Sequence, residues 1–503
     1  MILLNFSNAF KATLLVTLLI KLVLAYVVPM SGDEAYFIIW AKNLDFGYYD
    51  HPPMAGWFLY LMRFLGDSEI ILRLPAILLS TFIGFGIYQL LKTRDESKAA
   101  LIAILYLISP LNILNVLITT DTPLILFAFL SAASAYKALE KDQLAWYGLS
   151  GVFFGMAFLS KYFAVLLGLA YLAYFLFSRK NWHNTRGFAL LFLAALPFAL
   201  INLYWNYTHC WDNILFNLYT RNEGEQFSLG KITAYFGTQV YLISPPVIYY
   251  LFKHRSGFVE KLKTDNLKLF FFAFFVPMAA FAALSMKKLI GLHWVLAFYP
   301  FLYILLYLFL SREELLKTVK FMAWFSAAHL AIIAVISVMP METWKNTKWY
   351  DGIVFMFKTD EIAENIRPYE KEFLLAADGY TPAAIISYHY GKDFFVFGEG
   401  SYHARQDDIV TDFRQFSGRN ILVVKKSAPD LTQYAPYFQR VENKQFNLRG
   451  ATFYYVLGYN FNYEQYKNNV LKPIKEKYYK IPDYLPHTPC YFCEKYFNEG
   501  AKP

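Results

Sequence analysis

Apolar runs long enough to cross a bilayer recur along two thirds of this chain. A hydrocarbon core about 30 Å thick needs roughly 20 apolar residues in a helix, and a spanning segment must satisfy its backbone as a helix or in a closed barrel. Such runs lie at 9–28, 70–91, 99–118, 122–138, 145–160, 162–178, 187–205, 232–252, 268–285, 291–310 and 318–338. The sequence predicts a polytopic α-helical membrane protein with about 11 transmembrane helices.

The composition agrees with this class. Of 503 residues, 57% are hydrophobic, 20% aromatic and only 17% charged, as in an integral membrane protein. The net charge of +9 raises nucleic-acid binding as an alternative. We exclude it, because the lysines and arginines fall mainly in short loops between apolar runs and in the tail, as positive-inside sorting produces.

The basic loops also predict the orientation. Lys92, Arg94 and Lys98 follow the second run, and basic residues likewise follow the other even-numbered runs, so these loops are expected in the cytoplasm. The N-terminus is then cytoplasmic and the part after the last run lies outside. Since the runs carry almost no acidic residues at mid-depth, we see no sign of an ion path through the membrane.

The chain after Met339 has no spanning run and predicts a small soluble α/β domain. We therefore expect two domains: 1–339, transmembrane and including an outer loop at 29–69, and 340–503, soluble. In the second, helices are expected at 360–367 and 381–390 and strands at 372–377, 394–397 and 421–424, with a late strand pair at 445–459. The last forty residues are expected to pack along the domain's edge.

The outer loop is longer and chemically richer than a connector needs. Its acid pair, Asp33 and Glu34, precedes a helix-like run, and its Asp50-His51-Pro52-Pro53 turn follows Tyr48. The acids either cap a helix or act as a base or acceptor-orienting group at the membrane surface.

Two further motifs lie at outer ends of apolar runs. Asp121, in Leu117–Pro123, stands at a helix start and is either a cap or a second functional acid. Lys161, in the tightest outer hairpin, either snorkels to the headgroups or contacts a lipid phosphate. The same two interpretations hold for Lys287, Lys288 and His293. Arg221 is either a further candidate of this kind or only a solvated charge.

A divalent metal is an alternative to these cations as the source of positive charge beside a phosphate, with Asp33, Asp121, Asp50 and His51 as possible ligands. Cofactors are otherwise unknown. Three cysteines are too few for a disulfide scaffold, although Cys490 and Cys493 could form a disulfide in an oxidising compartment.

The order of these motifs resembles the bacterial branch of the dolichyl-phosphate-mannose protein mannosyltransferase superfamily. The resemblance covers about the first 310 residues, through GDEAYFIIWAKNLDFGYYDHPPM, FLGDSEIILRLPAIL, LITTDTPL, LSKY and KKLIGLHWVLAFYP. It implies a membrane glycosyltransferase of the C-type fold, similar to the transferase that adds aminoarabinose to lipid A. It further implies a bacterial inner-membrane location, with the active site and the C-terminal domain in the periplasm.

The resemblance also implies roles for residues. Asp33 matches the acidic residue of the family's first outer loop, Asp121 matches its second acid, and Lys161 matches the basic residue near the carrier phosphate. We assign catalytic roles to Asp33, Asp121 and Glu34. Asp50-His51-Pro52 falls where the lipid A enzymes carry Glu-Lys-Pro, so His in place of Lys is a departure. We assign phosphate contacts to Lys161, His51, Lys287, Lys288 and Arg221, and substrate contacts to Tyr48, Asp50 and His293.

The predicted function is inverting transfer of a sugar from a polyprenyl (undecaprenyl) phosphate carrier to lipid A or another envelope glycoconjugate. Charge neutralisation at the departing phosphate and an aligned acceptor are what this chemistry needs. Alternatives are an enzyme resembling protein O-mannosyltransferases, a transporter or flippase for the lipid-linked sugar, and a structural or assembly protein.

Overall fold

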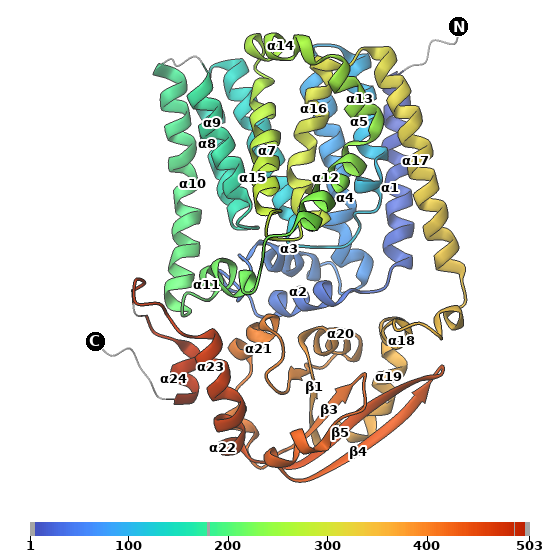
Figure 1. The fold of residues 1–503 in the computed structure, drawn as a ribbon, viewed down its shortest axis with the longest axis vertical. Helices are drawn as coiled ribbons and strands as arrows, with labels where there is room; N and C mark the ends of the chain where they lie inside the picture. Colours follow the sequence, from blue (N-terminus) through green and yellow to red (C-terminus); the bar gives the residue numbers. More distant parts are fainter. Residues whose placement is uncertain (1–5, 179–181, 487, 498–503) are drawn as a thin grey trace. The chain divides into compact units, whose positions relative to one another are not determined.

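A computed structural model describes residues 6–178, 182–486 and 488–497 (Figure 1). The chain folds as two compact units. Unit 1 takes in the described parts of Met1–Val28, Pro52–Ile201 and Gly224–Ser337, and unit 2 those of Pro29–His51, Asn202–Glu223 and Val338–Pro503. Each unit is described by itself.

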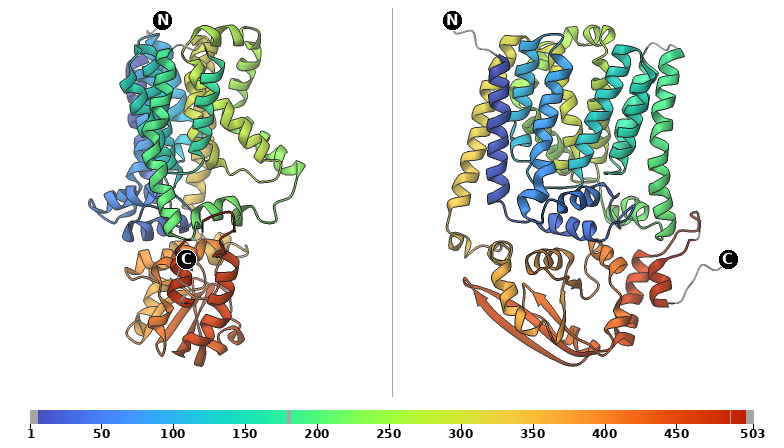
Figure 2. Two further views of the ribbon diagram at one scale, coloured as in Figure 1. Left: turned by 90° about the vertical axis from the view of Figure 1, so that its left-hand side faces the viewer. Right: turned by 180° about the vertical axis from the view of Figure 1, so that it is seen from behind.

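The long helices of unit 1 run side by side, and shorter helices connect them (Figures 1 and 2). They are α1 (Phe6–Val27), α3 (Met54–Arg63), α4 (Glu69–Leu91), α5 (Glu96–Ile108), α6 (Pro110–Ile113), α7 (Asp121–Lys141), α8 (Leu144–Phe158), α9 (Ala164–Phe177), α10 (Trp182–Thr208), which continues into unit 2, α12 (Leu229–Ile243), α13 (Pro245–Lys253), α14 (Phe258–Thr264), α15 (Lys268–Leu284), α16 (Tyr299–Phe309) and α17 (Arg312–Val338).

Each predicted apolar run is helical over most of its length, although two are broken where proline removes a backbone donor. Residues 114–118 lie in no helix, and the run at 291–310 begins as a 3-10 helix, Leu292–Phe298. The run at 99–118 leaves its helix at Ser109-Pro110, and the run at 232–252 changes helix at Ser244-Pro245. Among the described residues, six helices are long and apolar enough to span a bilayer, and three shorter ones are apolar. The prediction of a multi-pass helical membrane protein is confirmed.

Two buried basic side chains fasten α1 to α4. Lys21 donates from Nζ to Ala76 O at 2.8 Å and to Ser80 Oγ at 2.9 Å. Arg73 donates to Ala25 O at 2.6 Å and Val28 O at 2.7 Å, where α1 ends and its carbonyls lack helical partners. These cations inside a spanning region thus bind backbone carbonyls of the neighbouring helix.

A hydroxyl cluster fixes α7, α8 and α9 relative to one another. Ser131 Oγ lies 2.7 Å from Tyr171 OH and donates to Ser150 O at 2.9 Å. Gly151 of α8 lies so close to α10 that a Cβ there would be 2.1 Å from Leu191 O. Since side-chain hydrogen bonds and small residues set helix contacts in membranes, this cluster determines where the α8–α9 hairpin lies.

Unit 2 contains a sheet with helices on both of its faces. Its helices are α2 (Gly32–Lys42), α11 (Asp212–Leu218), α18 (Tyr350–Phe357), α19 (Thr359–Ile366), α20 (Tyr380–Tyr390), α21 (Arg405–Val410), α22 (Tyr463–Tyr466), α23 (Lys472–Tyr478) and α24 (Tyr491–Phe497), and its strands are β1 (Phe373–Ala377), β2 (Phe395–Val396), β3 (Asn420–Lys425), β4 (Phe438–Leu448) and β5 (Ala451–Phe461).

The strand order is β2-β1-β3-β5-β4. β1 pairs in parallel with β2 and β3, whereas β5 is antiparallel to β3 and β4. Ile421 to Val424 of β3 are all buried, as expected for a central strand covered on both faces. The predicted strands and the helix beginning at Thr381-Pro382 are confirmed.

The first part of the outer loop packs within unit 2. α2 lies against α20, and a Cβ at Gly32 would be 2.2 Å from Thr381 Cγ2, so only glycine permits this approach. A Cys210–Cys490 disulfide ties the 202–223 segment to the C-terminal part. The contacts therefore place 29–51 with 338–503, whereas the sequence placed the whole loop with the transmembrane domain.

Two predictions about the tail are wrong. Cys490 pairs with Cys210 and not with Cys493, because a turn after α10 brings Cys210 to the start of α24. The last forty residues do not merely line an edge: in their described part, Tyr466, Ile474 and Phe492 are buried in the core that contains Val423 and Val456.

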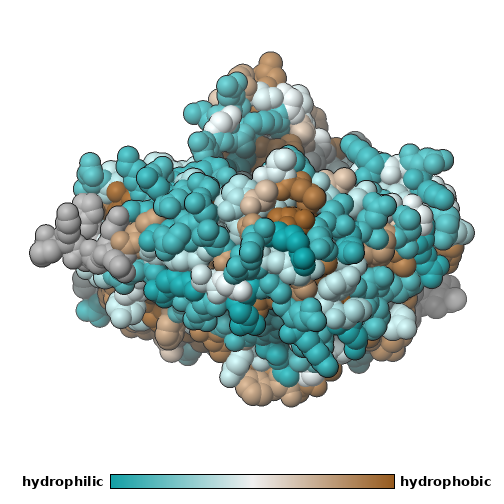
Figure 3. Space-filling model, turned by 90° about the horizontal axis from the view of Figure 1, so that it is seen from below, coloured by the Kyte–Doolittle hydropathy of each residue, from teal (hydrophilic) through white to brown (hydrophobic). Residues whose placement is uncertain are grey.

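The molecular surface in the view of Figure 3 is mainly hydrophilic, with small apolar areas.

Candidate functional site

The candidate residues fall into two groups, one in each unit. In unit 1, Asp121 is the first residue of α7, where the positive end of the helix dipole favours a carboxylate. Its amide donates to Thr119 Oγ1 at 3.2 Å, and the amide of Thr119 donates to Thr122 Oγ1 at 3.2 Å. The Thr-Thr-Asp-Thr sequence thus closes the turn that presents the carboxylate.

Lys161 lies in the tight turn between α8 and α9. Its amide donates to Ala157 O and its carbonyl accepts from the amide of Ala164, so the backbone of the turn is fixed. Nζ lies 2.8 Å and 2.7 Å from the two carboxylate oxygens of Asp121. The two side chains are 5% and 3% exposed, so they form a buried ion pair at the ends of three helices.

His293 adds a third polar group to this pair. Its Nε2 lies 4.0 Å from Asp121 Oδ2, and its side chain is 56% exposed. The structure thus brings together three of the residues that the sequence singled out, from α7, the α8–α9 turn and the 3-10 helix Leu292–Phe298. Breaking the buried pair of Asp121 and Lys161 would be costly, because one charge would be left uncompensated.

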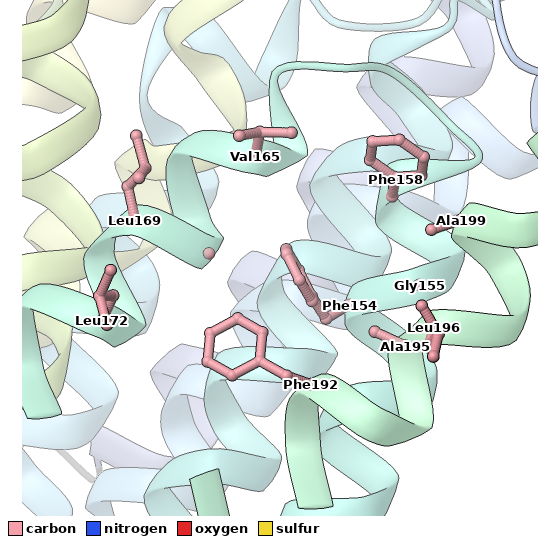
Figure 4. Close-up of a pocket in the computed structure, with 11 residues that line it drawn as sticks. Phe154, Gly155, Phe158, Val165, Leu169, Leu172, Phe192, Ala195, Leu196 and Ala199 are labelled. Atoms are coloured by element: carbon pink, nitrogen blue, oxygen red, sulfur yellow. The ribbon is translucent and has the colours of Figure 1, made fainter. Parts of the chain in front are cut away.

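An apolar groove lies along the α8–α9 hairpin that carries Lys161 (Figure 4). Its volume is about 360 Å³. Phe158 and Val165, which flank the turn in sequence, line it together with side chains from α8, α9 and α10 such as Phe154, Leu172 and Phe192. No lining residue is charged, so the groove suits a hydrocarbon chain.

Two further cations of unit 1 for which the sequence predicts a phosphate contact, Lys287 and Lys288, lie after α15. Lys287 is exposed and its carbonyl accepts from Lys231 Nζ at 2.6 Å. A hydrogen bond from Lys231, with a smaller effect of Lys288, holds the pKa of Glu225 below its usual value. Both lysines thus take part in a charged loop, and their contact with phosphate stays a prediction.

In unit 2, the two adjacent acids Asp33 and Glu34 have different surroundings. Glu34 is buried and forms a capping box with Ser31: the Ser31 amide donates to Glu34 Oε2 at 3.1 Å, and the Glu34 amide donates to Ser31 Oγ at 3.2 Å. For Glu34 the structure supports the capping interpretation. Asp33 is exposed, and Tyr380 OH donates to its Oδ1 at 3.4 Å.

The Asp50-His51 turn is held from inside the unit. Tyr48 is fully buried, stacks on Trp40 at 4.5 Å and donates from its amide to His51 O at 2.9 Å. Asn217 donates to Asp50 O at 3.2 Å. The structure thus gives Tyr48 a packing role in place of the predicted substrate contact.

Asp50 has a partner that the sequence did not reveal. His403 Nδ1, 353 residues away, lies 3.0 Å from Asp50 Oδ2. Burial opposes ionisation of Asp50, but the charges of His51 and His403 and the hydrogen bond from His403 outweigh it and lower the pKa of the carboxyl. Only the fold joins these residues; a lone histidine in a Ser-Tyr-His-Ala-Arg segment carries no motif.

A buried polar network supports the segment that bears His403. Gln406 accepts from the amide of Tyr49 at 2.8 Å, and Arg405 pairs with Asp408 at 3.0 Å. Burial, followed by the charge of Asp408, raises the pKa of Asp407 to about 7.

Arg221, the remaining predicted phosphate-binding residue, lies in a 3-10 turn of unit 2 and is half-buried.

The proposed metal ligands are not gathered in one cluster. Among the residues that the structure describes, no group of three or more His, Cys, Asp or Glu side chains could hold a metal ion. Zn²⁺ and Ca²⁺ sites normally use several such ligands, whereas Mg²⁺ is usually held by one or two carboxylates together with substrate phosphates. We therefore derive no step through a metal.

Comparison with solved structures identifies the fold of this chain. ArnT from Cupriavidus metallidurans, solved bound to undecaprenyl phosphate, matches 90% of this chain and 98% of its own with a TM-score of 0.63 at 14% identity. At this identity the match establishes the fold.

The sequence comparisons cover a smaller part of the chain than the structural match does. Residues 50–205 match the model of the dolichyl-phosphate-mannose-protein mannosyltransferase family. Lipid A galacturonosyltransferase RgtD of Rhizobium johnstonii is 24% identical over 245 residues, which cover 46% of this chain and 51% of RgtD. The chain thus matches about half the length of this relative. The predicted resemblance to the superfamily is confirmed.

Proposed function

We propose that the protein transfers a sugar from a polyprenyl phosphate carrier to lipid A or another envelope glycoconjugate, at the periplasmic face of the bacterial inner membrane. The observation that carries this proposal is the buried Asp121–Lys161 ion pair on a C-type fold. ArnT of the same fold is bound to undecaprenyl phosphate and RgtD is a lipid A galacturonosyltransferase, which agrees with such a donor and acceptor.

Lys161 supplies the positive charge for the carrier phosphate. As the bond between the anomeric carbon and the phosphate oxygen breaks, negative charge grows on the phosphate, and a fixed ammonium stabilises it. Asp121 keeps the lysine charged and oriented before the substrate arrives, since an unpaired buried ammonium is unstable. His293, beside Asp121 and exposed, offers a further donor to the phosphate.

The groove of Figure 4 fits the carrier's hydrocarbon chain. It begins at Phe158 and Val165, three residues before and four after Lys161, and follows α9 as far as Leu172. A carrier bound in this way would place its hydrocarbon chain against the apolar side chains of the groove and its phosphate beside Lys161. Attack by the acceptor on the opposite side of the anomeric carbon inverts its configuration.

The test is binding of undecaprenyl phosphate to the purified full-length protein. K161Q is expected to weaken binding about 10–100-fold, the loss of a hydrogen bond to a charged group. K98Q is the matched control, because Lys98 Nζ also donates to a protein acceptor in unit 1, Tyr307 O at 2.6 Å, but Lys98 lies in the first turn of α5, at the end of the helix expected to face the cytoplasm. Equal affinities of K161Q and wild type would dismiss the phosphate role.

Transfer itself is measured by mass spectrometry of lipid A and envelope glycans from cells with and without the gene. A sugar present only when the gene is present supports the proposal. Identical glycans in both strains contradict it. A modified protein in place of a modified lipid would favour the O-mannosyltransferase-like alternative.

A further inference from the structure

The last and longest part of unit 2 begins where a spanning helix ends. α17 is 27 residues long and ends at Val338, which is the first residue of that part. A helix of this length rises about 40 Å, roughly the thickness of a bilayer with its headgroup regions. Val335, Ile336 and Val338 are exposed apolar side chains, the last of them 81% exposed. The chain therefore leaves the lipid close to Val338.

The connection from Val338 to α18 is made of tight turns. The amide of Thr343 donates to Pro340 O at 3.0 Å, and the amide of Tyr350, the first residue of α18, donates to Thr347 O at 3.2 Å. Turns closed by such bonds advance only about 2 Å per residue. Within unit 2, α18 therefore follows soon after the point at which the chain leaves the bilayer.

α18 carries apolar side chains on both of its sides. One side is buried in unit 2, through Tyr350, Val354 and Phe355. The other side presents Trp349, Ile353 and Phe357, which are spaced four residues apart and therefore form one stripe. Trp349 and Phe357 are 58% and 52% exposed, and Ile353 is half-buried. We call these three side chains the outer stripe.

The next helix, α19, shows how a helix of this unit looks when its outer side faces water. It buries Ile362, Ala363 and Ile366. Its other side bears the exposed polar side chains of Asp360, Glu364 and Asn365. A polar outer side is the usual pattern for a helix on a soluble surface. The outer stripe of α18 departs from this pattern, and apolar side chains grouped on a surface mark a contact.

Two lysines indicate what makes this contact. Lys345 and Lys348 are exposed and precede α18, and Lys348 Nζ lies 5.8 Å from the centre of the Trp349 ring. Tryptophan is enriched where a bilayer meets water, and lysine extends its ammonium group to the headgroups above apolar surface. The segment also has exposed acids, Glu342 and Asp351. Asp351 is two residues from Trp349 and therefore lies on the far side of α18.

We propose that residues 341–357 form an interfacial anchor that binds the phospholipid leaflet at which α17 ends. The outer stripe enters between the lipid headgroups, as in helices that lie in the membrane interface, and Lys345 and Lys348 bind the headgroup phosphates. A lipid surface fits better than a soluble partner, because the chain reaches α18 directly from the bilayer. The anchor goes beyond sugar transfer, since it concerns how unit 2 is attached to the membrane.

The test uses the full-length protein, one copy per nanodisc of phosphatidylethanolamine and phosphatidylglycerol, with a nitroxide spin label on one introduced cysteine. Cys210 and Cys490 are bonded to each other and Cys493 is buried, so wild-type protein treated with the label gives the background. Collisions of the nitroxide with oxygen, which concentrates in lipid, are compared with collisions with a water-soluble nickel chelate.

W349C and F357C should each give an oxygen-to-nickel collision ratio several-fold above that of N365C. N365C is the matched control, because Asn365 is exposed on the neighbouring helix. Adding K345Q and K348Q to F357C should lower the ratio at residue 357, since the lysines no longer hold phosphates. An unchanged ratio in that variant refutes the phosphate contact. If one of the two single-cysteine proteins does not fold, the other decides.

Two outcomes overturn the anchor. Ratios at residues 349 and 357 equal to that at residue 365 show that the outer stripe faces water. Low collision rates with both reagents show that it is covered by protein, and a second copy is then the first candidate if the rates rise on dilution to one copy per disc. Because no sugar transfer is measured, either result leaves the proposed function to its own test.

Discussion

Removing the negative charge that pairs with Lys161 should lower the free energy of unfolding of unit 1 while leaving its structure largely unchanged. Asp121→Asn is nearly isosteric, but it leaves a lysine that is 5% exposed without the carboxylate 2.7 Å away. An opposite pair 4 Å apart interacts by about 4 kcal/mol at an effective dielectric constant of about 20. Since loss of one partner of a buried pair costs about 3–5 kcal/mol, we expect about 3 kcal/mol for D121N.

The double variant separates pairing from packing. K161Q alone leaves the Asp121 carboxylate buried and should cost a similar amount. D121N/K161Q buries no net charge, so its loss should be smaller than the sum of the two single losses by about 2 kcal/mol or more. The shortfall is the coupling energy of the pair.

The assay is denaturant unfolding of the four purified proteins in one detergent, followed by tryptophan fluorescence. Additive losses, or a D121N protein within 1 kcal/mol of wild type, would show that the pair contributes no coupling and would refute the reasoning. The R63Q variant is a suitable comparison, since Arg63 pairs with Asp67 at 2.7 Å but Asp67 is 63% exposed and an exposed pair is worth about 0–1 kcal/mol.

Two predictions concern unit 2. C490S should lower its stability by about 2–5 kcal/mol, and peptide mapping without reductant should recover a Cys210–Cys490 link; a Cys490–Cys493 link would refute the pairing. Because the pKa of Asp407 is raised from 3.8 to about 7, the native state holds a proton that the unfolded chain loses near pH 4, so stability should fall as pH rises from about 4 to 7. Denaturation at pH 5 and 7.5 should show this fall, D407N should reduce it, and an unchanged pH dependence in D407N would exclude Asp407 as its source.

The helices of unit 1 could be predicted because lipid imposes a simple rule on sequence. Every apolar run is helical over most of its length, and two of the breaks fall at Ser109-Pro110 and Ser244-Pro245, where proline is visible in the sequence. The acids at Asp33 and Asp121 were likewise recognisable as helix starts. Such features depend on residues within one or two turns.

The partners of these residues could not be predicted in the same way. The sequence marked Asp121 and Lys161 separately, and their contact depends on how α7 packs on the α8–α9 hairpin through Ser131, Ser150 and Tyr171. Cys490 has a nearer cysteine in Cys493, yet it bonds to one 280 residues away. Sequence proximity alone favoured the wrong pair.

Hydropathy and helix-start chemistry are local, so the sequence was sufficient to predict that this chain enters a membrane, where its helices lie and which charged residues stand at their ends. Three features appear only in the folded protein: 29–51 packs with the C-terminal domain, Tyr48 is buried and His403 meets Asp50. A carboxylate hidden from water requires a partner, and which part of the chain supplies one depends on the packing of segments hundreds of residues apart.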